Sequence, residues 1–256
     1  MSQIHYITGA AGTGKTYELS NALLRWVEHN TLLEHQVILA LTKMHGSRKR
    51  LSERLVSRSI HTRIKVSTVD SFALNLVNRW RLSFGYKSPI IPSLNKGNFT
   101  EDELGLRATF DEIREVAARV LESPFVAKTV SNSYPVILVD EFQDCVGDQL
   151  AIISNLANYT DIILAADPFQ ALNGDESACD WVNGLEEQEF VEFTRLTQPR
   201  RSSSQYIQDA AIAILESRPA EYRESQIPFF SVPTYGLAPW RVIPSSVSQS
   251  ENALCR

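Results

Sequence analysis

The chain has 256 residues, of which 43% are apolar and 21% are charged, a composition typical of folded rather than disordered proteins. It holds no apolar run near the ~20 residues that cross a bilayer, no N-terminal stretch typical of a secretory signal, and three widely spaced cysteines. Membrane-spanning, secreted and disulfide-framework classes are therefore excluded, and we expect a reduced, cytoplasmic protein with no membrane partner.

The charge is divided unevenly along the chain. Residues 1–90 hold 13 Lys and Arg against 5 Asp and Glu, whereas residues 91–256 hold 12 against 25, and the formal net charge is −5. The total argues against a simple basic nucleic-acid binder. The basic N-terminal third fits either a surface that faces a polyanion or a solvated basic helix, and charge alone does not choose between them.

Strand and helix patterns alternate over the first third of the chain. Apolar runs predict strands, and apolar residues at helical spacing predict helices. The expected strands are residues 3–8, 37–41 and 65–68, and the expected helices are residues 15–30, 43–58 and 70–82.

Residues 84–133 break this alternation, because prolines and a glycine interrupt their first part. Thr100 is followed three positions later by Glu103, a spacing typical of a capping box at a helix start. We therefore expect a helix from Thr100 to about Ser123, and a mainly helical insertion over residues 84–133.

The alternation resumes after residue 133, with strands expected at 136–139, 162–166 and 190–193 and helices at 150–158 and 202–215. Apolar strands that alternate with helices predict an α/β fold, in which helices cover both faces of a parallel sheet. We assign residues 1–200 to one lobe. Residues 201–256 are expected to be the incomplete start of a second lobe with a Pro/Ser-rich tail, which includes one strand pattern at 240–243.

A glycine-rich segment between the first expected strand and helix fits the phosphate-loop pattern at every fixed position. Its glycines would let backbone N–H groups surround a phosphate, and the helix N-terminus would add its positive dipole end. Lys15 is expected to reach the β- and γ-phosphates of ATP, and the Thr16 hydroxyl to bind Mg²⁺. The segment reads Gly9-Ala10-Ala11-Gly12-Thr13-Gly14-Lys15-Thr16.

Polar side chains follow two of the apolar strands. Asp140 and Glu141 come directly after strand 136–139, and Gln170 follows strand 162–166. Parallel strands bring such groups to one edge of a sheet, where ligands bind. Asp140 is then placed for Mg²⁺, and Glu141 is placed to orient and deprotonate a water molecule that attacks the γ-phosphate. Gln170 on its own fits either a phosphate contact or an ordinary loop glutamine.

Six segments in this order resemble the UvrD/Rep-like superfamily 1 DNA helicases over residues 4–205: GAAGTGKT, ALTKMHGSRKRL, STVDSFAL, VDEFQD, AADPFQAL and LTQPRRSS. The resemblance implies a RecA-like P-loop NTPase lobe that uses ATP and Mg²⁺. It implies that Gln170 senses the γ-phosphate and that Arg201 reaches it. It also implies that single-stranded DNA is held by residues in the second and third segments, Thr42, Lys43 and Ser71.

The sequence departs from the family pattern in several places. The glutamine motif that reads adenine in the family is absent before Gly9, but Tyr17 and Arg200 offer an aromatic and a guanidinium group, which we expect to enclose the base. Leu41 and residues 173–175 stand where the family has base-stacking aromatics. Phe72 and Trp181 are substitutes or core residues. The later family motifs V and VI are not found.

Two functions follow from this pattern. The first is an ATP-binding and ATP-hydrolysing lobe of a UvrD-like helicase, which couples MgATP hydrolysis to single-stranded DNA, with 3′–5′ movement expected of the complete enzyme. A second lobe or a protein partner would supply the missing motifs. The second is a P-loop nucleotide switch or regulatory module that unwinds nothing and needs a partner in trans. Glu141 favours the first, because a switch has no need of a hydrolytic base.

Overall fold

The computed structural model describes residues 2–42, 49, 51–53, 55, 63–94, 100–102, 105–170, 178–198, 229–231 and 242–244. The chain divides into two units, Met1–Thr197 and Gln198–Arg256. In the second unit the described residues form two short antiparallel strands, β10 (Phe229–Ser231) and β11 (Val242–Pro244). The assignment of this unit to the start of a second lobe stays a prediction.

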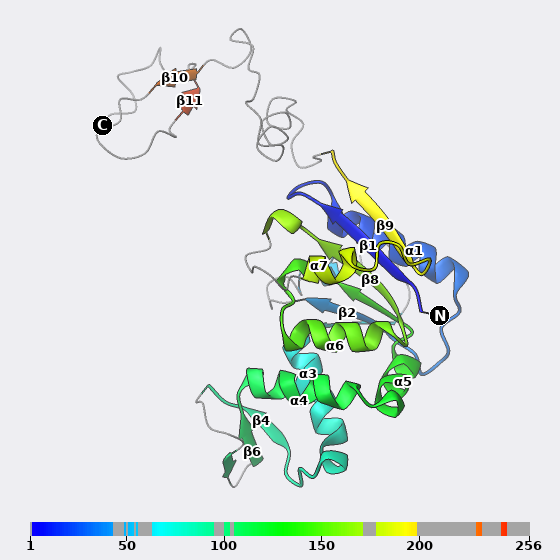
Figure 1. The fold of residues 1–256 in the computed structure, drawn as a ribbon, viewed down its shortest axis with the longest axis vertical. Helices are drawn as coiled ribbons and strands as arrows, with labels where there is room; N and C mark the ends of the chain where they lie inside the picture. The colour runs from blue at the N-terminus through cyan, green and yellow to red at the C-terminus, as the bar shows by residue number, and fades with distance from the viewer. Residues whose placement is uncertain are drawn as a thin grey trace. The chain divides into compact units, whose positions relative to one another are not determined.

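The first unit is built on a six-stranded sheet whose strands are all parallel, in the order β3-β2-β7-β8-β1-β9 (Figure 1). Because the strands are parallel, their carboxyl ends all meet at one edge. The central strand β7 is apolar and buried along its whole length, and β8 is so after its first residue, as expected where both faces are covered. The six strands are β1 (Ile4–Gly9), β2 (Ile38–Thr42), β3 (Ile64–Thr68), β7 (Val136–Val139), β8 (Asp161–Ala166) and β9 (Val191–Leu196).

Helices follow the strands, as the periodicity predicts. The α-helices with full bounds are α1 (Lys15–His29), α3 (Val69–Trp80), α4 (Phe110–Leu121), α5 (Pro124–Ser133), α6 (Asp148–Ala157) and α7 (Ala178–Asn183). Short 3₁₀ turns are η1 (Arg81–Phe84), η2 (Phe142–Asp144) and η3 (Pro168–Gln170). None of the helices in the described ranges is long and apolar enough to cross a membrane.

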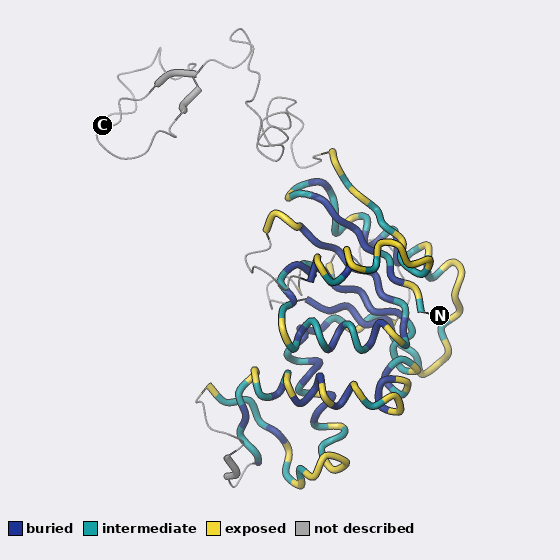
Figure 2. Tube along the Cα trace, in the orientation of Figure 1, coloured by how far each residue is buried: buried dark blue, intermediate teal, exposed yellow. Residues whose placement is uncertain are grey.

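Two separate cores confirm that both faces of the sheet are covered. Along β2, Ile38 and Ala40 point into a core that includes Leu19 and Leu23 of α1. The alternate residues of β2 enter the other core, which α3, α4, α5 and α6 complete. Figure 2 shows the strands of the sheet mostly buried and the helices beside them partly buried and partly exposed. The predicted α/β P-loop NTPase fold is therefore confirmed.

The segment expected as a mainly helical insertion is more mixed. Its first part forms a small three-stranded sheet in the order β4-β6-β5, and its second part forms α4 and α5. The strands are β4 (Ile90–Pro92), β5 (Thr100–Asp102) and β6 (Gly105–Ala108).

The expected helix start at Thr100 is wrong, because Thr100 lies in β5 and pairs with Arg107 of β6. The helix begins nine residues later. Thr109 accepts a hydrogen bond from the Glu112 amide, and the Glu112 carboxylate accepts one from the Thr109 amide at 2.7 Å. This pair completes a capping box with the same spacing as the one expected at Thr100.

Two expected helices fall wholly or largely outside the described residues. Residues 202–215 are not described. Of the expected helix 43–58, the structure describes Lys49, residues 51–53 and Leu55, all of which are helical. Leu51 and Leu55 are each 1% exposed and belong to the α1-side core, so the expected apolar face of that segment is buried.

Candidate nucleotide site

The loop between β1 and α1 has the backbone of an anion cradle. Gly12 and Gly14 have φ angles of 85° and 96°, in the left-handed region that glycine enters without strain. Thr13 is buried, and its hydroxyl donates to the Ala10 carbonyl at 2.8 Å, which holds the loop closed on itself. Because Gly14 is the N-cap residue, no side chain caps the first amides of α1. These amides can therefore bind phosphate oxygens.

The Lys15 ammonium group lies over this loop. It donates to the carbonyl oxygens of Gly9 at 2.8 Å and Ala10 at 3.0 Å, and it forms an ion pair with Asp167 at 3.2 Å. The Lys15 side chain is 11% exposed and that of Asp167 is 1% exposed, so the pair is buried. The contact arises from strand order, because β8, which Asp167 follows, is hydrogen-bonded to β1.

Asp167 also holds the loop that carries Gln170. One carboxylate oxygen of Asp167 accepts from the Gln170 amide at 2.9 Å as well as from Lys15. The other oxygen accepts from the Phe169 backbone amide at 3.1 Å. The predicted phosphate-sensing residue Gln170 and the predicted phosphate-binding residue Lys15 thus share one carboxylate.

The end of β7 carries the two acidic residues predicted for catalysis. Asp140 is buried, and its backbone amide donates to the Leu41 carbonyl at 3.1 Å. Glu141 has a φ angle of 57°, and among the described residues it is the one non-glycine residue in the left-handed region. Such a conformation costs free energy and persists where the surrounding structure enforces it.

Gln143 joins this strand end to the next one. Its amide nitrogen donates to the Glu141 carboxylate at 2.9 Å, and its amide oxygen accepts from the Asp167 backbone N–H at 2.9 Å. Glu141, Gln143, Asp167, Lys15 and Gln170 therefore form one hydrogen-bonded chain across the carboxyl edge of the sheet. The structure brings together residues from the phosphate loop and both acidic strand ends.

Two members of this chain, Asp167 and Gln143, were not among the site residues predicted from the sequence. The signal for Asp167 is present, because it follows an apolar strand in the same way as Asp140 does. What the sequence does not contain is the strand order that sets β8 directly beside β1. Gln143 lies in VDEFQD, one of the segments that resemble the helicase family, but no role was predicted for it from that resemblance.

The remaining predicted site residues lie apart from this chain or outside the described residues. Thr16 is in the first turn of α1. Tyr17 is 49% exposed, so much of its side chain is accessible. Three predicted residues, Lys43, Arg200 and Arg201, are outside the described residues.

The two described residues predicted to contact DNA have different surroundings. Thr42, at the end of β2, is 0% exposed, so an outside phosphate would reach its hydroxyl only after local movement. Ser71 is partly exposed in the first turn of α3, where its amide donates to the Thr68 hydroxyl. Of the alternative stacking residues, Phe72 is buried and Trp181 packs edge-to-face on Phe142, as core residues do.

Several ionisable groups on and beside β1 have shifted pKa values because they are buried. Burial lowers the pKa of His5 below its ordinary value of 6.5, against an opposing effect from Glu192. Burial raises the pKa values of the Tyr6 hydroxyl and the Cys179 thiol. A buried thiol with a raised pKa is a poor nucleophile, so Cys179 is a core residue rather than a reactive one.

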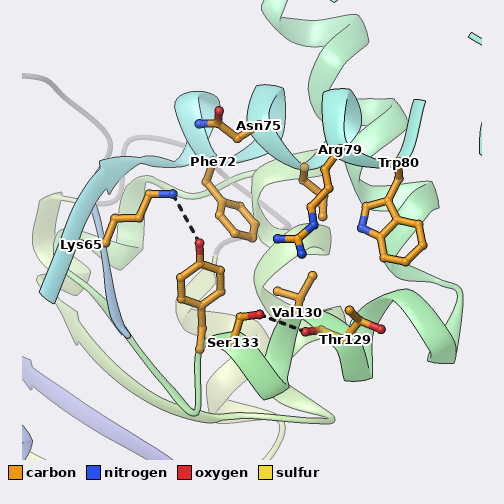
Figure 3. A pocket seen from close by; sticks show the side chains of 10 residues that line it. Lys65, Phe72, Asn75, Arg79, Trp80, Thr129, Val130 and Ser133 are labelled. Atoms are coloured by element: carbon orange, nitrogen blue, oxygen red, sulfur yellow. Dashed lines mark hydrogen bonds between the residues drawn. The ribbon is translucent and has the colours of Figure 1, made fainter. Parts of the chain in front are cut away.

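A separate cavity of about 260 Å³ lies between α3 and α5. Figure 3 shows Arg79 and Trp80 of α3 beside Thr129, Val130 and Ser133 of α5. Its lining includes Phe72 but none of the residues predicted to bind nucleotide or metal. It lies by the amino ends of the strands, because Lys65 is near the start of β3, whereas the phosphate loop follows the carboxyl end of β1. The cavity is therefore not part of the nucleotide site.

A family model described as an AAA domain matches residues 1–174. The chain belongs to this AAA domain family. The match includes the phosphate loop, both acidic strand ends and Gln170, which are the elements joined in the structure. Together with the parallel sheet, the assignment confirms the prediction of a P-loop ATPase lobe, whereas its superfamily 1 and UvrD-like character stays a prediction.

Two solved structures are similar to this AAA domain chain. The arterivirus nonstructural protein 10 helicase is 12% identical over 75% of this chain and 34% of its own, with a TM-score of 0.27. The Pif1 helicase from Candida albicans is 13% identical over 89% of this chain and 47% of its own, with a TM-score of 0.40. This chain thus spans a third to a half of these proteins. No curated protein matches it.

Proposed function

We propose that this chain is an ATP-binding and ATP-hydrolysing lobe of a UvrD-like DNA helicase, which couples MgATP hydrolysis to binding of single-stranded DNA. The observation that carries the proposal is the hydrogen-bonded chain from Glu141 through Gln143 and Asp167 to Lys15 and Gln170. It connects a group suited to activate water with two groups suited to contact a terminal phosphate. A protein that only binds nucleotide does not need the first of these.

Each residue of the site would have a separate role in phosphoryl transfer. The loop amides and Lys15 would hold the β- and γ-phosphates, so that Lys15 neutralises charge on the oxygens. Glu141 would orient a water molecule and accept its proton while the water oxygen attacks the γ-phosphorus and the bond to ADP breaks. Gln170 would contact the γ-phosphate, and Arg201 would stabilise the charge of the transition state. Movement of the complete enzyme is expected to be 3′ to 5′.

The oxygen ligands of the site suit Mg²⁺, which prefers carboxylate, hydroxyl and water oxygens. Thr16 and the buried Asp140 would hold it, Asp140 directly or through water. When bound, Mg²⁺ neutralises phosphate charge in the reaction. Tyr17 and Arg200 would enclose the adenine, and the exposure of Tyr17 is compatible with that role.

DNA contacts are proposed for Thr42, Lys43 and Ser71, on the motif order that the sequence shares with the helicase family. Hydroxyl and ammonium groups there would bind backbone phosphates and hold the strand without reading its sequence. The buried position of Thr42 makes Ser71 the better supported of the two described residues.

The test is ATP hydrolysis by the purified chain, with and without single-stranded DNA, for the wild type and Glu141→Gln. Glu115→Gln, on an exposed position of α4, is the matched control. We expect turnover that DNA stimulates, that Glu141→Gln abolishes and that Glu115→Gln leaves unchanged. Binding of MgATP without turnover or any response to DNA would instead indicate a nucleotide switch and would contradict the proposal.

A further inference from the structure

Gln143 has an environment that few surface-loop glutamines share. It is 2% exposed, and it lies in η2, directly after β7. The turn is fixed by its neighbour Phe142, which is fully buried and packs edge-to-face on Trp181 at 6.1 Å between ring centroids. The Gln143 side chain therefore has little freedom to turn away from the edge of the sheet.

The nitrogen and the oxygen of the Gln143 amide both form hydrogen bonds, and their partners lie at the ends of two different strands. The nitrogen donates to the carboxylate of Glu141 after β7, and the oxygen accepts from the backbone of Asp167 after β8. A side chain held in this way fixes the position of Glu141 relative to Asp167. An amide suits this place, because it donates at its nitrogen and accepts at its oxygen, whereas an ionised carboxylate only accepts.

Asp167 lies at the other end of this link and carries two further contacts. One of its carboxylate oxygens accepts from both Lys15 and Gln170. Both donors belong to residues expected to meet the terminal phosphate. A phosphate that attracts these donors changes the hydrogen bonding of the Asp167 side chain, while the backbone of the same residue stays bonded to Gln143.

We propose that Gln143 is a positioning residue that holds the Glu141 carboxylate in place and couples it to the residues that meet the γ-phosphate. The proposal rests on the proposed function, because it gives Glu141 the role of the group that activates water. Glu141 has a left-handed backbone conformation, and the hydrogen bond from Gln143 is one contact that would hold its side chain in place. Gln143 itself acts through Glu141 and needs no contact with nucleotide.

Two substitutions separate the two links. Gln143→Glu keeps an acceptor for the Asp167 amide but replaces the donor to Glu141 with a carboxyl group that, when ionised, repels the Glu141 carboxylate, whereas Gln143→Leu breaks both links. Gln149→Leu is the matched control, because Gln149 is also buried in this lobe, at 8% exposure, and donates to Asp70 rather than to the site. Thermal melting of all three variants shows whether each one folds.

Steady-state kinetics with MgATP provides the first readout. We expect both Gln143 variants to lower kcat about 10- to 100-fold, in the range typical of residues that orient a catalytic group, while KM changes less than about 3-fold. In a Glu141→Gln background the same substitutions should cause no further loss, because the group they position is already gone. A loss of kcat no larger than that of Gln149→Leu would overturn the proposal.

Hydrogen exchange measured by mass spectrometry, with a non-hydrolysable ATP analogue and Mg²⁺, provides a readout that needs no turnover. In the wild type we expect the analogue to protect residues 139–144 and 165–170 together. In Gln143→Leu we expect the protection of residues 139–144 to fall while that of residues 165–170 is kept, and wild-type protection of both segments would overturn the proposal. A wild type without turnover contradicts the proposed function, and the exchange result then decides the role of Gln143 separately.

Discussion

Removal of the Asp167 carboxylate tests the buried ion pair of the site. In Asp167→Ala, the Lys15 ammonium keeps the carbonyl oxygens of Gly9 and Ala10 but loses the counter-charge of the Asp167 carboxylate, and two further donors lose their acceptor. Breaking a buried ion pair by removing one partner costs ~3–5 kcal/mol, because the remaining charge is left uncompensated.

The expected magnitude is at the low end of this range, because two carbonyls still solvate Lys15 and its side chain is 11% exposed. We expect Asp167→Ala to lower the free energy of unfolding by about 3 kcal/mol. For a protein of this size that loss lowers Tm by about 6–12 °C. Urea denaturation followed by circular dichroism measures the first value, and thermal melting measures the second.

The control is Asp111→Ala, which also removes an acidic partner of an ion pair. The Asp111 side chain is 82% exposed and pairs with Arg114, and exposed pairs contribute only about 0–1 kcal/mol. A double variant that adds Lys15→Met removes the uncompensated Lys15 charge and should recover part of the lost free energy of unfolding. Destabilisation below about 1 kcal/mol for Asp167→Ala, or additive effects of the two substitutions, would refute the reasoning.

Three other substitutions test the loop, the sheet and the corrected helix start. A Cβ at Gly9 would lie 2.7 Å from the Leu196 carbonyl oxygen, so Gly9→Ala should lower the free energy of unfolding by about 1–3 kcal/mol and weaken ATP binding, measured by titration. A Cβ at Gly184 would have contacts of 3.5 Å, so the control Gly184→Ala should be tolerated. The free energy of unfolding should fall as the pH drops below 6.5, because His5 binds a proton more readily in the unfolded chain than in the fold, where it is buried. His5→Gln should reduce this dependence of stability on pH, measured by urea denaturation across that pH range. Thr109→Ala should destabilise the fold by about 1 kcal/mol in the same melts, and Thr109→Ser, which keeps the capping oxygen, should not.

Local patterns were enough to predict the main sheet and the phosphate loop. Apolar strands such as Val136–Val139 are buried on both faces, and few other local structures accommodate such a run between polar turns. The loop needs only its own glycines, the strand before it and the helix after it. Each of these features is contained within about fifteen neighbouring residues.

The helix start after the small sheet shows where local patterns fail. Thr100 with Glu103 and Thr109 with Glu112 have the same spacing, so both fit a capping box. The choice between them depends on the pairing of Thr100 with Arg107, a contact between strands. Strand pairing is not visible in the capping pattern, and it overrides that pattern at the first position.

The link between Lys15 and Asp167 could not be predicted for a related reason. The two residues are 152 positions apart, and their contact depends on β8 being inserted between β1 and β7. The sequence indicates that both strand ends carry carboxylates, but it does not indicate which of them neighbours the loop. The structure assigns that place to Asp167, and this leaves Asp140 and Glu141 one strand further away.

The pairing of β9 with β1 has a mechanical consequence. Leu196, the last residue of β9, is in register with Gly9, so the last strand of the first unit ends beside the phosphate loop. Pulling on the chain past Leu196 along the strand direction would load the β1–β9 hydrogen bonds in shear, so that they resist together rather than rupture one at a time. Tension on the chain after Leu196 would therefore act on the β1–β9 hydrogen bonds, and so on Gly9, before it acted on the rest of the sheet.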